Sequence, residues 1–209
     1  MTRPINIAIL VVALIGGVLA FKQHHETRIL EDEYNRLTAT FGELDVNDES
    51  KFHVAFVPSD DDKMFRWRAF YPAGLGLRTE SDSPNGSTGG TNTRASATTE
   101  VVTCAFRFET QKIMVFVGGS GSGNTLMSIG SGLATPFLKE HWDELEFSIL
   151  GKDGMEILDD SSMLTFIEIT IPELLADQMV KELGPMSERY RKRVFRLRTG
   201  TQAAFVKNP

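Results

Sequence analysis

The sequence has 209 residues, of which 41% are hydrophobic, and this is enough for one folded domain with additional segments. Its 28 acidic residues outnumber its 22 basic residues, and the formal net charge of −6 argues against general nucleic-acid binding. The single cysteine, Cys104, excludes a disulfide within the chain, and four histidines without cysteine partners argue against a structural zinc site.

The N-terminal region is predicted to be a membrane anchor. After a short tail, residues 1–4, the segment 5–21 has Asn6 as its only polar residue, and as a helix it spans about 25 Å. We therefore expect the lipid bilayer to be a partner of residues 5–21, in a single-pass signal-anchor with the C-terminal domain outside the cytoplasm. The alternatives are a cleaved signal peptide, with Val18, Leu19 and Ala20 at its cleavage site, and a buried core helix.

Residues 22–46 have the pattern of an amphipathic, coiled-coil-like helical stem. The apolar side chains Leu30, Tyr34, Leu37, Phe41 and Leu44 recur in steps of 4, 3, 4 and 3 residues. Two heptads are compatible with self-association of two chains and equally with packing of the stem on its own domain.

Residues 51–209 are predicted to form a mainly β domain, because apolar and polar side chains alternate there with a period of two. The expected strands are residues 53–57, 65–71, 102–108, 113–117, 145–149, 164–171 and 194–198. This number of short strands predicts an antiparallel β-sandwich-like fold with one or two short helices. We expect the helices at residues 172–183 and 136–144, the second with Thr135 as its N-cap, and a hairpin turn at residues 151–154.

Two polar segments are predicted to be long loops. Residues 79–100 contain no large apolar side chain and are expected to be a disordered loop within the domain. The glycine-rich segment after residues 113–117 lacks the lysine of a phosphate-binding loop and the glycine spacing of a dinucleotide fingerprint, so it is expected to be a mobile connection. If both loops lie at the same end of the domain, they form a recognition rim.

No motif in the chain predicts a catalytic site, a cofactor or a metal ion. The serines beside Gly119 and Gly121 do not complete a nucleophile motif, and neither His53 nor His141 has a recognisable triad around it. The predicted function is therefore an interaction or structural module on a membrane anchor. The alternative is a membrane-tethered or secreted hydrolase whose site is assembled only in space.

The basic residues are concentrated near the C-terminus. Six of them fall within residues 189–198, namely Arg189, Arg191, Lys192, Arg193, Arg196 and Arg198. In an acidic chain, this run is either an electrostatic interaction patch for a protein or an anionic partner, or it pairs with acidic side chains of the same chain.

Overall fold

The computed structural model describes residues 44–119, 122–130 and 132–207, and the compact unit that contains them begins at Leu44. The predicted anchor and the stem before Leu44 lie outside the described residues and stay predictions. In the part of the chain that is described, no helix combines the length and the apolar character that crossing a membrane requires.

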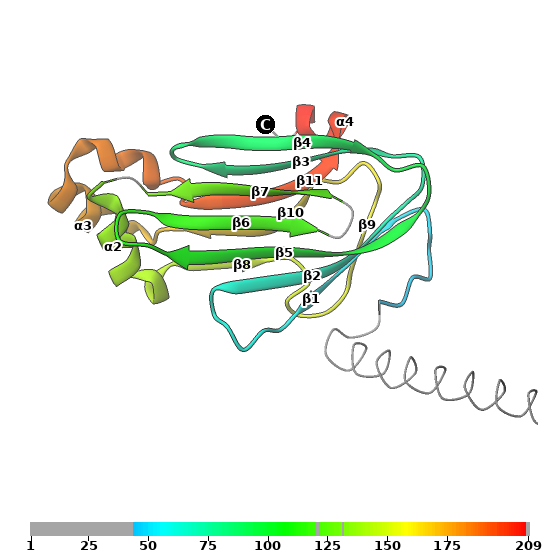
Figure 1. The fold of residues 1–209 in the computed structure, drawn as a ribbon, viewed down its shortest axis with the longest axis horizontal. Helices are drawn as coiled ribbons and strands as arrows, with labels where there is room; N and C mark the ends of the chain where they lie inside the picture. The colour runs from blue at the N-terminus through cyan, green and yellow to red at the C-terminus, as the bar shows by residue number, and fades with distance from the viewer. Residues whose placement is uncertain (1–43, 120–121, 131, 208–209) are drawn as a thin grey trace, which may run out of the picture. The chain divides into compact units, whose positions relative to one another are not determined.

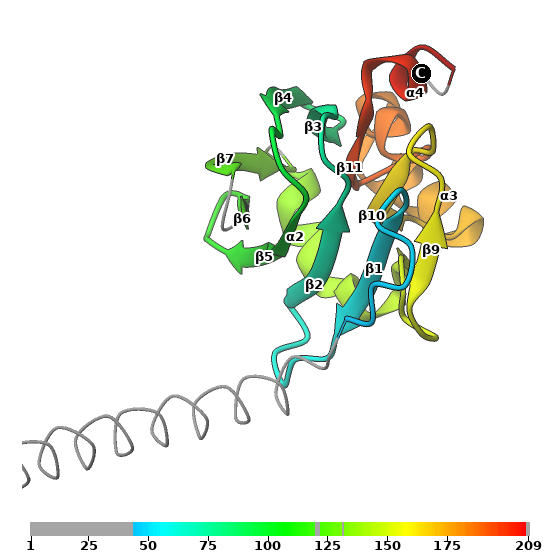
Figure 2. The same cartoon turned by 90° about the vertical axis from the view of Figure 1, so that its right-hand side faces the viewer.

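The domain consists of two antiparallel β-sheets that face each other (Figures 1 and 2). The first sheet has the order β7-β6-β5-β2-β1-β9. Its strands are β1 (Phe52–Val57), β2 (Met64–Tyr71), β5 (Thr98–Phe108), β6 (Ile113–Gly119), β7 (Ser122–Ile129) and β9 (Glu156–Leu158). The second sheet has the order β4-β3-β11-β10-β8. Its strands are β3 (Gly76–Ser83), β4 (Gly86–Thr93), β8 (Glu146–Ile149), β10 (Leu164–Thr170) and β11 (Phe195–Thr201). The predicted mainly β, sandwich-like fold is confirmed.

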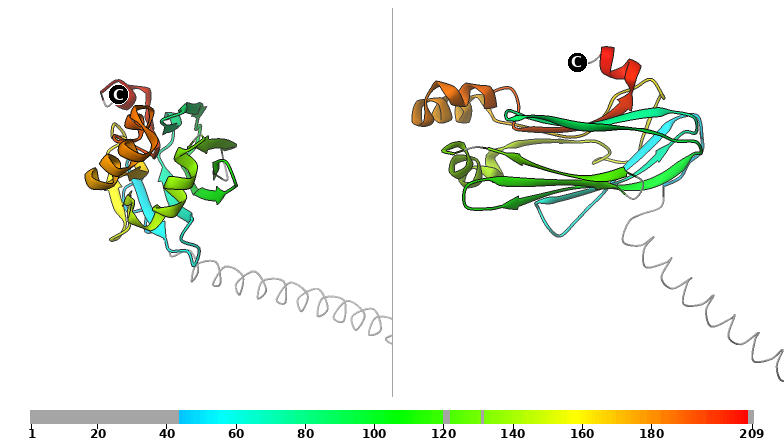
Figure 3. Two further views of the ribbon diagram at one scale, coloured as in Figure 1. Left: turned by 90° about the vertical axis from the view of Figure 1, so that its left-hand side faces the viewer. Right: turned by 45° about the horizontal axis from the view of Figure 1, so that its top comes forward.

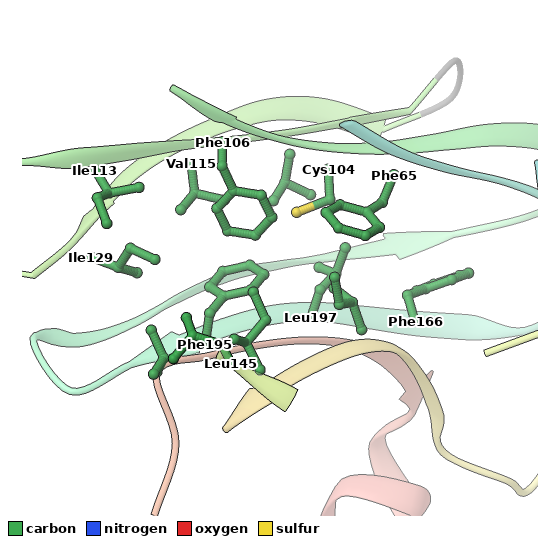
Figure 4. Close-up of a cluster of buried hydrophobic side chains, with 14 of the residues drawn as sticks. Phe65, Cys104, Phe106, Ile113, Val115, Ile129, Leu145, Phe166, Phe195 and Leu197 are labelled. Atoms are coloured by element: carbon green, nitrogen blue, oxygen red, sulfur yellow. The ribbon is translucent and has the colours of Figure 1, made fainter. Parts of the chain in front are cut away.

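The core lies between the sheets and is rich in aromatic side chains. In β2 the alternate residues Phe65, Trp67, Ala69 and Tyr71 are all buried, as their spacing predicted. The ring of Trp67 lies 5.3 Å from that of Phe166 in the other sheet. Phe106 and Phe195 also point toward one another across the core, with ring centroids 5.4 Å apart (Figure 4). These contacts bury the inward face of both sheets against each other.

Short helices cover the ends of the sandwich: α2 (Ala134–Glu140), α3 (Glu173–Leu183) and α4 (Gln202–Lys207), with 3₁₀ turns η1 (Trp142–Glu144) and η2 (Pro185–Tyr190). α2 and α3 lie at the same end of the sheets (Figures 1 and 3). The helix predicted at residues 172–183 is confirmed as α3. The helix predicted at 136–144 begins earlier and is interrupted at His141, and Thr135 is not its N-cap. Thr135 is buried inside α2, where its hydroxyl donates to the carbonyl of Gln111 at 3.0 Å.

The turn at residues 151–154 does not close a hairpin, so that prediction is wrong. β8 pairs with β10 in the second sheet, whereas β9 crosses to the first sheet and pairs with β1. Gly151 lies against β1, where the Phe56 N–H donates to its carbonyl at 3.3 Å. The chain therefore passes from one sheet to the other at this turn, because the edge of β1 offers a partner to β9.

The loop predictions for residues 79–100 and for the segment after residue 117 are also wrong. Residues 79–100 form most of β3, all of β4 and the first part of β5, and the glycine-rich segment continues as β6 and β7. The β3–β4 ladder pairs eight residues on each strand, so backbone hydrogen bonds order a segment that buries little apolar surface. The two-residue turn between β3 and β4 is Pro84-Asn85, with Gly86 next, and these turn-forming residues were the local signal for this hairpin.

Candidate functional site: a polar groove between two sheet edges

The two segments that sequence alone predicted to be loops lie together as edge strands. β4 is the last strand of the second sheet and β7 is the last strand of the first, and the two contact each other (Figure 2). Between them is a groove of about 290 Å³. Its lining comes from Thr79 and Ser81 of β3, residues 88–92 of β4, Arg94, Val117 of β6, and Asn124 and Thr125 of β7. The two segments therefore border a groove between strands and do not form a rim of two loops.

The edge of β4, and not only one of its faces, borders the groove. Five consecutive residues, 88–92, line it, although successive side chains of a strand point to opposite faces. The N–H of Arg94 donates to the carbonyl of Leu75 at 3.0 Å, so position 94 is hydrogen-bonded toward β3. Because antiparallel pairing alternates, positions 92, 90 and 88 are also directed toward β3. The main-chain groups of Ser87, Gly89, Thr91 and Thr93 are thus directed to the open side.

The inward face of the sandwich becomes polar at this groove. Thr79 and Ser81 follow the buried Leu77 at intervals of two, so they share its inward face. The hydroxyl groups of Thr79 and Thr199 lie 2.9 Å apart, and the Ser81 hydroxyl donates to the carbonyl of Thr88 at 3.3 Å. Elsewhere the same layer holds aromatic and aliphatic side chains. The groove therefore offers neutral hydrogen-bonding groups where a sandwich ordinarily has an apolar core.

A buried ion pair lies beside the groove. Arg94 and Glu100 form a two-pronged contact, with 2.7 Å from Nη2 to Oε2, and their side chains are only 10% and 5% exposed. The guanidinium also lies over the ring of Tyr71, at 4.5 Å from its centroid. Burial, together with the charge of Glu100, raises the pKa of Tyr71 despite the opposing charge of Arg94. Because the arginine is matched by the glutamate, this pair brings no net charge to the groove.

The predicted basic patch is divided by the fold. Four of its members pair with carboxylates of the same chain. Arg196 Nη2 lies 2.9 Å from Asp82 Oδ2, and Arg198 Nη2 lies 3.1 Å from Glu80 Oε1. Arg193 and Arg191 reach Glu168 and Asp177, respectively, at 2.7 Å. The remaining members, Arg189 and Lys192, are exposed. The internal pairing that the sequence left open therefore holds for these four arginines.

The two histidines considered for catalysis lie apart from the groove lining. His53 is fully buried, with Nε2 2.7 Å from the carbonyl oxygen of Asp48. His141 has Nδ1 2.6 Å from Glu144 Oε1 and its ring against Phe137. Each hydrogen bond thus goes to a group nearby in the chain rather than to a serine. Among the residues that the structure describes, no three His, Cys, Asp or Glu side chains are grouped so as to hold a metal ion.

The fold and the groove define the chain's described part as an antiparallel β-sandwich domain with a polar groove between two sheet edges. No protein-family model, no curated protein and no solved structure matches the chain.

Proposed function

We propose that the protein is a single-pass membrane-anchored protein whose β-sandwich domain is an interaction module. Residues 5–21 hold it in the bilayer, with the domain outside the cytoplasm, and residues 22–46 form a stem through which chains self-associate. The groove between β4 and β7 is the binding site, and its partner is an uncharged polar group or segment of another molecule.

The observation that carries this proposal is the polar lining of the groove. Hydroxyl and amide side chains converge there with the edges of two strands from different sheets. The lining residues Gly89 to Asn92 are exposed, so their polar groups bind water, and a partner with matching donors and acceptors replaces that water. The neutral Arg94–Glu100 pair favours a partner without formal charge.

Alkaline carbonate extraction tests the anchor. Membranes from cells that produce the full chain should retain it after washing with carbonate or high salt, and only detergent should release it. A variant that lacks residues 5–21 is the matched control and should appear in the wash. Release of the full chain by carbonate would contradict the anchor, and N-terminal sequencing of the mature protein distinguishes an anchor from a cleaved signal peptide.

Site-specific photo-crosslinking tests the groove. A crosslinking amino acid at Asn124, which lines the groove and is exposed, should give a discrete adduct in the native membrane. The same group at Met155, an exposed residue that does not line the groove, is the control and should not give that adduct. Identical adducts from both positions, or none from Asn124, would overturn the groove as the binding site.

A further inference from the structure

We propose that the groove binds its partner by strand addition: an extended polypeptide segment pairs along the open edge of β4. This inference rests on the proposed function and names the class of partner. The inference is based on the position of β4, an eight-residue edge strand that lies beside the groove. Five consecutive residues of β4 line this groove.

The first step is the direction of the main-chain groups. With positions 88, 90 and 92 directed toward β3, the N–H and C=O groups of Ser87, Gly89, Thr91 and Thr93 are directed away from it. These four residues repeat every two positions along one edge. That spacing matches the hydrogen-bonding pattern of an added antiparallel or parallel strand.

The second step is the absence of protection on this edge. Exposed edge strands usually carry lysine, proline or inward-pointing charges that prevent pairing with another chain. β4 has the sequence GSTGGTNT, with neither charge nor proline, and seven of its eight residues are exposed. Its small side chains also let another backbone approach closely. The edge is therefore built to accept a strand rather than to exclude one.

The third step is the chemistry of the partner. The groove lining is made of hydroxyl groups, amides and glycines, with Val117 as its one large aliphatic side chain and with Arg94 matched by Glu100. A volume of about 290 Å³ leaves room for small side chains beside the added backbone. We expect an uncharged segment of about seven residues, rich in Gly, Ser, Thr or Val, since seven residues span from position 87 to position 93.

Peptide selection tests the partner class. A display library of random seven-residue peptides is selected against the detergent-solubilised full chain, and the most enriched peptide serves as the probe. Enriched sequences should be uncharged. Thr91→Pro, which removes one open-edge N–H, should weaken binding of this peptide at least about tenfold, whereas Thr91→Val, which keeps the N–H, should change it less than about threefold. Proline is tolerated on edge strands, and a melting curve verifies that the variant folds.

Hydrogen exchange on the unaltered chain provides a second test of strand addition, and this test does not depend on whether the Thr91→Pro variant folds. The peptide should slow exchange at the amides of Ser87, Gly89, Thr91 and Thr93, while the amides directed toward β3 are slow before it is added. Equal binding by Thr91→Pro together with unchanged exchange at these amides would overturn strand addition, and so would failure to enrich any peptide.

Two outcomes separate this inference from its alternatives. If Asn124 still gives its crosslinked adduct but no open-edge amide is protected by peptide, the groove is a binding site and strand addition is wrong. If the chain alone is dimeric with these amides already protected, and Thr91→Pro makes it monomeric, the occupant is a second copy of the chain rather than a different partner.

Discussion

Arg196 of β11 and Asp82 of β3 lie directly opposite one another in the second sheet, with 2.9 Å between Nη2 and Oδ2. Two residues further along the same strands, Arg198 faces Glu80 at 3.1 Å. Cross-strand pairs of opposite charge stabilise a sheet, and these pairs are largely buried. The basic run of β11 is therefore the complement of acidic residues on β3, which is why so polar a segment is held in place as a strand.

Removing the charge of Asp82 should destabilise the domain in a pH-dependent way. Burial raises the pKa of the Asp82 carboxyl, but a hydrogen bond accepted from the protonated form of Glu80, the hydrogen bonds from Arg196 and the charges of Arg198 and Arg196 lower it more, so the pKa lies below its ordinary value. A carboxyl of this kind stabilises the fold above its unfolded-state pKa of about 4, and the contribution is lost as the pH falls through the folded-state value.

We therefore expect Asp82→Asn to lower the free energy of unfolding by about 2 kcal/mol at pH 7, measured by urea denaturation. The difference from the unaltered chain should shrink as the pH falls from about 4 toward 2. Asp160→Asn, at an exposed carboxylate, is the control and should have little effect at either pH. A difference at Asp82 that does not change with pH would contradict the assignment.

Removing only one charge of the Arg94–Glu100 pair should lower the free energy of unfolding more than replacing both residues by apolar ones. Glu100→Gln leaves the arginine buried without its counter-charge and should lower the free energy of unfolding by about 3 kcal/mol. The double substitution Arg94→Met with Glu100→Leu removes both charges and should recover most of that loss. Thermal and urea unfolding measure both variants. If the double variant is as unstable as the single one, the packing of these side chains, rather than charge matching, determines their contribution.

Neighbouring glycines of β4 should respond differently to alanine. A Cβ atom at Gly89 would lie 2.5 Å from the carbonyl oxygen of Thr79, whereas one at Gly90 would meet nothing within 4 Å. Gly89→Ala should therefore destabilise the domain by about 1–3 kcal/mol, because the β3 backbone must move. Gly90→Ala should be neutral or stabilise it by about 0.5 kcal/mol, through reduced freedom of the unfolded chain. Equal melting temperatures for the two variants would argue against the β3–β4 register.

The thiol of Cys104 should not react with thiol reagents while the chain is folded. The side chain is fully buried between the sheets, and this burial raises the pKa of its thiol, so the reactive thiolate is scarce at pH 8. We expect no reaction with Ellman's reagent until denaturant is added, when one equivalent should react. The adjacent Thr103, on the opposite face of β5, provides the control: a Thr103→Cys, Cys104→Ala chain should react while folded. Rapid reaction of native Cys104 would indicate that the two sheets separate.

Local patterns predicted the strands that bury side chains and missed those that do not. β2 and β5 were evident because Phe65, Trp67 and Val102 belong to alternating apolar series. β4 has no such series, and only the turn-forming residues Pro84, Asn85 and Gly86 indicated its hairpin. Ten of the eleven residues that line the groove, all but Val117, therefore lie in the two segments that the sequence alone predicts to be loops.

By itself, the sequence determined the two-residue alternation, the mainly β class and the helix at α3, because those features depend on side chains close together in the chain. The tertiary structure alone decided that Arg196 meets Asp82, that β9 pairs with β1, and that β4 and β7 border one groove. The physical reason is that strand pairing and edge position are set by register and by partners distant in the chain, so the groove exists only once both sheets have formed.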